Sequence, residues 1–182
     1  MPKRFSNESA ISDWQTTGPD LPLVWKTLEV VSLGTLSKLF SNFSDKDAKD
    51  LVATNFRLPQ HIVLESWLEC LTSLRNYIAH HARIWNRRFP QKPELLRRSR
   101  YPWIVNHPSQ PFKLYPILCC ITYWLNAIDA SNTFVSDFKV LLVKYPNVDT
   151  AAMGFVAGWE QPLPPGDSCN SWFYINMRKM YY

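Results

Sequence analysis

The sequence predicts an all-α protein, a bundle of about four to five helices. One stretch, residues 67–88 (WLECLTSLRNYIAHHARIWNRR), contains no Pro or Gly, and an apolar residue recurs in it every three or four positions. A second stretch, residues 112–129, repeats this helical period and is apolar around most of its circumference. Prolines such as Pro59 and Pro146 separate the helical stretches from their neighbours.

The composition limits the class of protein. The chain has 182 residues, 46% of them hydrophobic, so we expect one domain with a substantial core. A net charge of +5 permits a nucleic-acid partner without requiring one. The four cysteines form no CxxC pair, which favours reduced thiols packed as small hydrophobic residues. Because the chain has no apolar run of about 18 residues and no signal region, we expect a soluble cytoplasmic protein without a membrane partner.

The N-terminal half should contain two helices before the central one. Residues 1–20 are polar and without a sustained period, and we expect a flexible arm. A helix is predicted from residue 21 to about residue 40, with Pro22 in its first turn, where a missing N–H costs little. A short helix over about residues 45–55 follows, with Ser44 as the expected N-cap.

We interpret residues 67–88 as a single long helix. Its apolar stripe faces a core and consists of Trp67, Leu71, Leu74, Ile78, Ala82 and Trp85. The opposite face carries Asn76, His80, Arg83 and Arg87, with Arg75 on the flank. Most charged helical faces are simply solvated, but Glu69 is the only carboxylate in this stretch. We therefore expect this face to meet an anion.

The second half combines a loop with two further helices. Five prolines within residues 89–111 predict an extended loop, whose basic and aromatic residues can either clamp a phosphate backbone or pin the loop to the core. Helices are predicted over residues 112–129 and 132–145, the latter capped by Ser131 or Asn132. Residues 153–161 are aromatic and should pack back on the bundle. The expected helical domain thus spans residues 21–160, and the tail at 161–182 has no assignment.

Several kinds of active site find no support in the sequence. His80 and His81 are adjacent, so on a helix they point about 100° apart and cannot both face one ion. The chain has no HExxH motif, no zinc-type Cys and His spacing, no GxGxxG and no P-loop. No cysteine lies beside a histidine in the central helix. We therefore expect no metal and no cofactor.

The residues Arg75, Asn76 and His80 fit metal-independent cleavage of RNA. This reaction needs a base for the 2′-OH proton, an acid for the leaving 5′-oxygen and a cation for the charge on the phosphoryl group. Histidine is suited to proton transfer near neutral pH, and arginine offers several planar donors to phosphate oxygens. Asn76 lies one helical turn before His80, so its amide can hold the imidazole or the ribose. One copy gives an incomplete site, which a two-fold dimer would complete.

The stretch LRNYIAHHARIWNRR at residues 74–88 resembles the signature of the Abi (abortive infection) family, and its Arg–x4–His core resembles that of the HEPN superfamily. Other blocks also resemble the family, and together they cover roughly Leu21 to Glu160. They are LPLVWKTLEVVSLGTLSKLFSNF at 21–43, KLYPILCCITYWL at 113–125 and MGF…GWE at 153–160.

This resemblance implies an all-α HEPN fold, a symmetric homodimer and metal-independent ribonuclease activity in phage defence or toxin–antitoxin systems. It implies Arg75 and His80 as the catalytic pair with Asn76 as their polar partner, and an RNA or protein antitoxin as a further partner. His81 and Trp85 belong to the same signature, and we expect both to be structural because they lie on or beside the apolar stripe.

Two alternatives remain open at this stage. Arg83 and Arg87 can contact RNA phosphates or form structural salt bridges. The whole chain can be a non-catalytic RNA- or nucleotide-binding module, or a protein-interaction module whose basic face docks a protein antitoxin.

Overall fold

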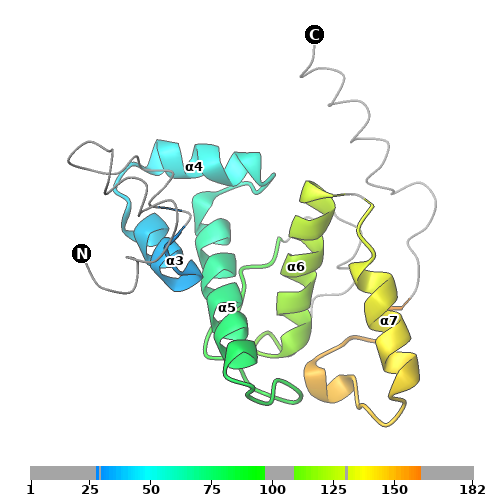
Figure 1. Cartoon of the computed structure of the whole chain (residues 1–182). Helices are drawn as coiled ribbons and strands as arrows, with labels where there is room; N and C mark the ends of the chain where they lie inside the picture. The colour runs from blue at the N-terminus through cyan, green and yellow to red at the C-terminus, as the bar shows by residue number, and fades with distance from the viewer. Residues whose placement is uncertain (1–27, 29, 97–108, 130, 161–182) are drawn as a thin grey trace, which may run out of the picture. The chain divides into compact units, whose positions relative to one another are not determined.

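The computed structural model describes residues 28, 30–96, 109–129 and 131–160 (Figure 1). This part of the chain contains five α-helices, a short 3-10 helix and no strand, which confirms the all-α prediction. The chain divides into two compact units, residues 1–44 and 45–182. The expected arm at 1–20, most of the loop at 89–111 and the tail at 161–182 lie outside the described residues, and the domain bounds 21–160 stay a prediction.

The described helix of the first unit is α3, Leu33–Asn42. Leu28 and Val30 are also helical, but the chain leaves the helix at Val31, and Ser32 is extended. The Ser32 hydroxyl accepts a hydrogen bond from the backbone N–H of Thr35 at 3.1 Å and so caps a new helix. The prediction of one uninterrupted helix to about residue 40 is therefore wrong, because this serine favours a cap over a helix interior.

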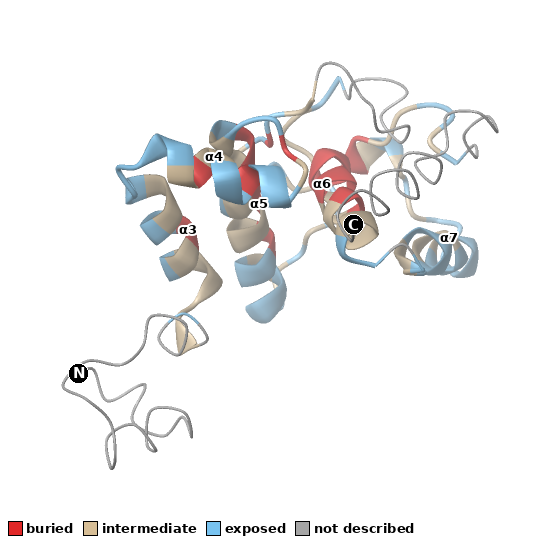
Figure 2. Cartoon of the chain, turned by 90° about the horizontal axis from the view of Figure 1, so that it is seen from above, coloured by how far each residue is buried: buried red, intermediate tan, exposed pale blue. Residues whose placement is uncertain are grey.

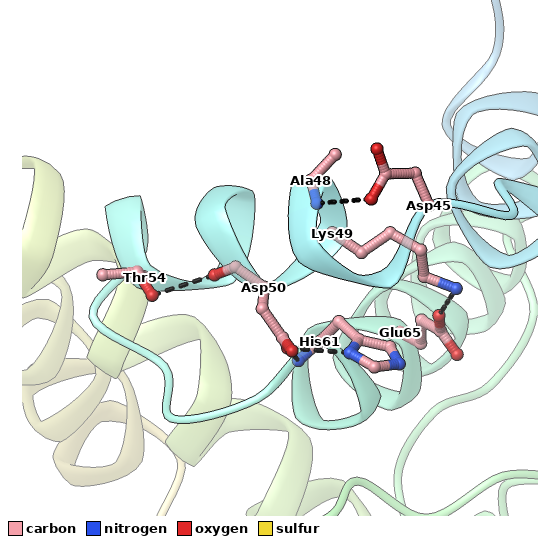
Figure 3. Close-up of polar contacts among 7 residues, drawn as sticks. All are labelled: Asp45, Ala48, Lys49, Asp50, Thr54, His61 and Glu65. Atoms are coloured by element: carbon pink, nitrogen blue, oxygen red, sulfur yellow. Dashed lines mark hydrogen bonds and ion pairs between the residues drawn. The ribbon is translucent and has the colours of Figure 1, made fainter.

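The second unit begins with α4, Lys46–Asn55, which matches the predicted helix at 45–55. Its N-cap is Asp45 rather than Ser44, because the Asp45 carboxylate accepts the N–H of Ala48 at 3.0 Å. Helix α4 packs against α5, and Figure 3 shows the polar contacts between them. Lys49 pairs with Glu65, and Asp50 accepts from the backbone N–H of His61 at 2.8 Å.

The central helix is α5, His61–Ala79, which begins earlier and ends sooner than the predicted range of 67–88. Two hydrogen bonds end it: Ala82 N–H donates to Tyr77 O at 2.8 Å, and His81 N–H donates to Ile78 O at 3.0 Å. This pair of bonds forms a Schellman motif, with His81 in the left-handed region at φ 52°. The sequence contains no Gly or Pro here to signal the stop, and histidine adopts this conformation more readily than most residues.

Helix α6, Leu114–Ile128, lies against α5 and matches the helix predicted at 112–129. The indole of the fully buried Trp67 meets the rings of Tyr123 and Trp124 edge-on, at centroid distances of 5.1 and 5.4 Å. The core continues along both helices and includes Cys70, Leu74, Phe89, Leu114, Ile117 and Met153. Figure 2 shows the contrast between the mostly buried α6 and the exposed α7.

Helix α7, Phe134–Lys144, matches the helix predicted at 132–145, although its N-cap is Thr133 instead of Ser131 or Asn132. After α7 come the 3-10 helix η2, Ala151–Met153, and an aromatic segment. Phe155 stacks on Phe138 of α7 at 5.6 Å between ring centroids, and Trp159 meets Phe155 at 4.7 Å. The described part of residues 153–161 thus packs back on the bundle, as expected.

Three of the four cysteines, Cys70, Cys119 and Cys120, are free and buried. Burial raises the pKa of Cys70 to about 12 and that of Cys119 to about 12, so these thiols stay protonated near neutral pH. Their burial matches the expectation of thiols packed as small hydrophobic residues, and Cys169 lies outside the described residues. Among the helices described, none combines the length and apolar character that a membrane crossing requires.

Candidate functional site

Arg75, Asn76 and His80 lie together at the C-terminal end of α5. Arg75 and Asn76 are in its last turns, and His80 is its C-cap residue, whose N–H donates to Asn76 O at 3.0 Å. All three side chains are exposed, whereas Leu74, directly before them, is buried in the core. The helix is thus held by its buried side and presents these three polar groups to solvent.

Asn76 contacts Arg75 rather than His80. A guanidinium nitrogen of Arg75, Nη1, donates to Asn76 Oδ1 at 3.2 Å. We expected the Asn76 amide to hold the imidazole or the ribose, and no bond to the imidazole is present among the described groups. The observed bond restrains the Arg75 guanidinium at the helix end, which is the arrangement that a positioned cation requires.

The His80 imidazole is exposed and makes no hydrogen bond to the described side chains. The Schellman motif fixes the backbone around it, since His81 adopts the left-handed conformation that turns the chain away from the helix. His81 was expected on or beside the apolar stripe, but it is exposed, and its structural role comes from its backbone. One imidazole and one guanidinium can move a proton and bind a phosphate oxygen.

Arg83 and Arg87 do not share a helical face with His80, because α5 has already ended. Arg87 is engaged within the protein: its Nε donates to Arg83 O at 2.6 Å, and its guanidinium carbon lies 4.2 Å from the Tyr77 ring centroid. Arg83 is exposed, and none of the described groups contacts its guanidinium. The two residues expected to act alike therefore have different environments.

The turn after α5 is bound to the start of α6 and to η2. Lys113 Nζ donates to Asn86 Oδ1 at 2.5 Å and to Asn86 O at 3.4 Å, and Phe89 N–H donates to Phe112 O at 2.7 Å. Trp85 Nε1 donates to Asp149 O at 3.3 Å. Sequence reasoning missed this anchoring, because a continuous helix would have placed Trp85 on the buried stripe.

The described residues contain no candidate metal site. In residues 28, 30–96, 109–129 and 131–160, no three His, Cys, Asp or Glu side chains lie close enough to hold an ion. The chemistry available at the end of α5 is that of an imidazole, an amide and a guanidinium.

Residues 2–86 match the family model for Abi-like proteins. This range covers slightly less than half of the chain and supports the Abi family. It includes Arg75, Asn76, His80 and Arg83 and ends just before Arg87. The Abi-like similarity starts nearer the N-terminus than the expected Leu21, so it includes most of residues 1–20, which we expected to be a flexible arm. The later blocks at 113–125 and 153–160 fall outside the match, and their resemblance stays a prediction. No curated protein and no solved structure matches the chain.

Proposed function

We propose that the chain is an Abi-like protein of phage defence by abortive infection, and that it acts as a metal-independent HEPN-type endoribonuclease. The observation that carries this proposal is the exposure of Arg75, Asn76 and His80 at one end of α5, inside the part of the chain that matches Abi-like proteins. A toxin–antitoxin setting, with an RNA or protein antitoxin, belongs to the same proposal.

The proposed reaction is an in-line attack within RNA. A base removes the proton of the 2′-OH, the 2′-oxygen bonds to the neighbouring phosphorus, and the bond from phosphorus to the 5′-oxygen breaks. An acid gives a proton to that leaving oxygen, so the products are a 2′,3′-cyclic phosphate and a 5′-hydroxyl end. His80 serves in proton transfer. Arg75 stabilises the charge on the phosphoryl oxygens, and the 3.2 Å hydrogen bond that it donates to Asn76 Oδ1 orients it.

A single chain carries one copy of His80 at this end of α5, beside the exposed His81. The reaction needs both a base and an acid, and in this proposal each is a His80 imidazole. A homodimer with a two-fold axis near the helix ends would supply His80 and Arg75 twice, around one phosphate. One imidazole would then act as base and the other as acid. The helix end suits this assembly because its side chains are exposed.

The test is a cleavage assay on total and transfer RNA in EDTA. The wild type should cleave and leave 2′,3′-cyclic phosphate ends, while Arg75→Ala and His80→Ala should each lower the rate at least about 100-fold. Asn76→Ala should have a smaller effect, since it acts through Arg75. The matched control is His81→Asn, which removes the adjacent imidazole but tolerates the left-handed backbone at φ 52°.

Cleavage that depends on added Mg²⁺ would overturn the mechanism. Equal losses in His80→Ala and His81→Asn would do the same, because the role would then not belong to His80. If the folded wild type binds RNA in a salt-dependent manner but never cleaves it, the alternative of a non-catalytic RNA-binding module holds instead.

A further inference from the structure

Trp85 is an exposed aromatic residue next to the candidate site. It is 39% exposed, whereas Trp67 in the core is 1% exposed. Scattered exposed apolar residues are ordinary, so exposure alone decides little. What distinguishes Trp85 is that the protein fixes its orientation while leaving much of it in solvent.

A hydrogen bond orients the Trp85 ring: the indole N–H donates to the backbone carbonyl of Asp149 at 3.3 Å. Asp149 is itself held, because its carboxylate accepts the N–H groups of Ala151 and Ala152 at 2.9 and 3.3 Å. That carboxylate is thus tied to the first two residues of η2. The next residue, Asn86, is locked in the left-handed region at φ 51° by Lys113. A ring held in this way loses little conformational entropy on binding.

Two exposed arginines flank Trp85 along the chain, and the carbonyl that its indole N–H contacts belongs to the exposed Asp149. Arg83 is exposed two residues before it, and Arg88 is exposed three residues after it. The Arg88 guanidinium carbon lies 4.3 Å from the Phe112 ring centroid, which holds this cation in place. No Asp or Glu occurs between His80 and Arg88. An apolar protein partner would need a wider apolar surface, whereas an exposed indole flanked along the chain by two arginines fits a nucleotide.

The separation of Trp85 from His80 along the chain is short enough for one RNA strand to reach both residues. Trp85 is five residues after His80, and an extended chain spans at most about 3.6 Å per residue, so their Cα atoms are at most about 18 Å apart. A strand of a few nucleotides can cover this span. We propose that Trp85 is the stacking platform for an unpaired base of single-stranded RNA whose phosphates are bound by Arg83 and Arg88. This inference deepens the proposed function and rests on it.

Stacking needs an accessible base face, so the inference predicts a preference for single strands. The experiment measures binding of a fluorescent single-stranded RNA and of a matched duplex to the His80→Ala protein, in which RNA stays intact. Replacing Trp85 by Leu in this background should weaken single-strand binding about ten-fold and leave duplex binding within about two-fold. Replacing it by Phe should keep most of the affinity, because the ring remains although the bond to Asp149 is lost.

A second readout is tryptophan fluorescence. Single-stranded RNA should quench it in the His80→Ala protein, and the quenching should be smaller after Trp85→Phe. Unchanged binding and quenching in the Trp85→Leu protein would overturn the inference. Equal losses for Leu and Phe would also overturn it, because the role would then be the structural N–H bond. Binding that depends on Trp85 without any cleavage by the wild type would refute the nuclease but leave the stacking site standing.

Discussion

Lys113, the residue before α6, holds Asn86 in the turn after α5 through two hydrogen bonds from one ammonium group, at 2.5 Å to the side-chain oxygen and 3.4 Å to the backbone carbonyl. Asn86 has a positive φ of 51°, a conformation that non-glycine residues adopt only when the surroundings support it. Lys113 is thus one of the links between the turn after the candidate site and α6, beside the bond from Phe89 N–H to Phe112 O. The connection makes the shape of the turn depend on a residue far away in the sequence.

Replacing Lys113 by Met should lower the free energy of unfolding by about 1 kcal/mol, because the change removes the charged donor and keeps the side-chain stem. Hydrogen exchange in residues 80–89 should also become faster, since the turn loses its anchor. Urea denaturation and exchange measured by mass spectrometry check both effects. Lys92→Met is the control, since Lys92 is exposed, and it should change stability by less than about 0.5 kcal/mol. Equal effects of the two substitutions would show that the Asn86 bonds contribute nothing.

Gly154 and Gly158 form a matched pair for a second prediction. Both have a positive φ, 85° and 81°, so alanine at either position meets the left-handed penalty of about 1–2 kcal/mol. At Gly154 a Cβ would also lie 2.7 Å from Cβ of Lys113, whereas at Gly158 it would meet nothing within 4 Å. Gly154→Ala should therefore destabilise the protein by about 1–3 kcal/mol more than Gly158→Ala. Chemical denaturation measures the difference, and equal losses would contradict the close approach of Lys113.

Hydrophobic periodicity was sufficient to predict α6, because Leu114–Ile128 is apolar and continuous, and its buried residues run from Leu114 to Tyr123. It failed where polar groups or backbone conformation decide the structure. Ser32 interrupts a helix whose apolar pattern continues across it, and His81 ends α5 without the glycine that usually marks such a stop. Periodicity registers which side chains are apolar, and it does not register a left-handed residue or a capping hydroxyl.

The candidate site was likewise only partly predictable from the sequence. The grouping of Arg75, Asn76 and His80 at one helix end could be predicted from their spacing, because all three belong to α5 or its cap. Arg83 and Arg87 follow the end of the helix, so helical geometry gave them a common face that does not exist. Their actual difference depends on Tyr77, whose ring lies under Arg87. No pattern in the sequence points to that contact.

A third prediction concerns the stability of the protein at low pH. The backbone N–H of His61 and then its ring, 2.7 Å away at Nδ1, hold the pKa of Asp50 below its ordinary value. Because the pKa is lowered in the folded state, this carboxylate stabilises the protein above the unfolded pKa, and the contribution disappears as the pH falls through the folded pKa. Below about pH 4 the wild type should therefore lose stability faster than Asp50→Asn, whose amide oxygen can still accept the His61 N–H but which does not titrate.

Urea denaturation of both proteins from pH 2.5 to pH 6 measures this difference. Ser131 lowers the pKa of Asp129 as well, so both proteins should retain some dependence on acid. The comparison isolates Asp50, because Asp129 is the same in both. Parallel pH curves for the two proteins would refute a role for the contact between Asp50 and His61.

The last prediction separates Arg83 from Arg87. Arg87→Ala should lower the free energy of unfolding by about 1–2 kcal/mol, because it removes the contact with the Tyr77 ring and the bond to Arg83 O. Arg83→Ala should change stability by less than about 0.5 kcal/mol. In the His80→Ala background, however, it should weaken RNA binding and reduce the slope of log affinity against log salt by about 1, as loss of one phosphate contact requires. If instead Arg83→Ala unfolds the protein while Arg87→Ala alters only the salt slope, the assignment of the two arginines is reversed.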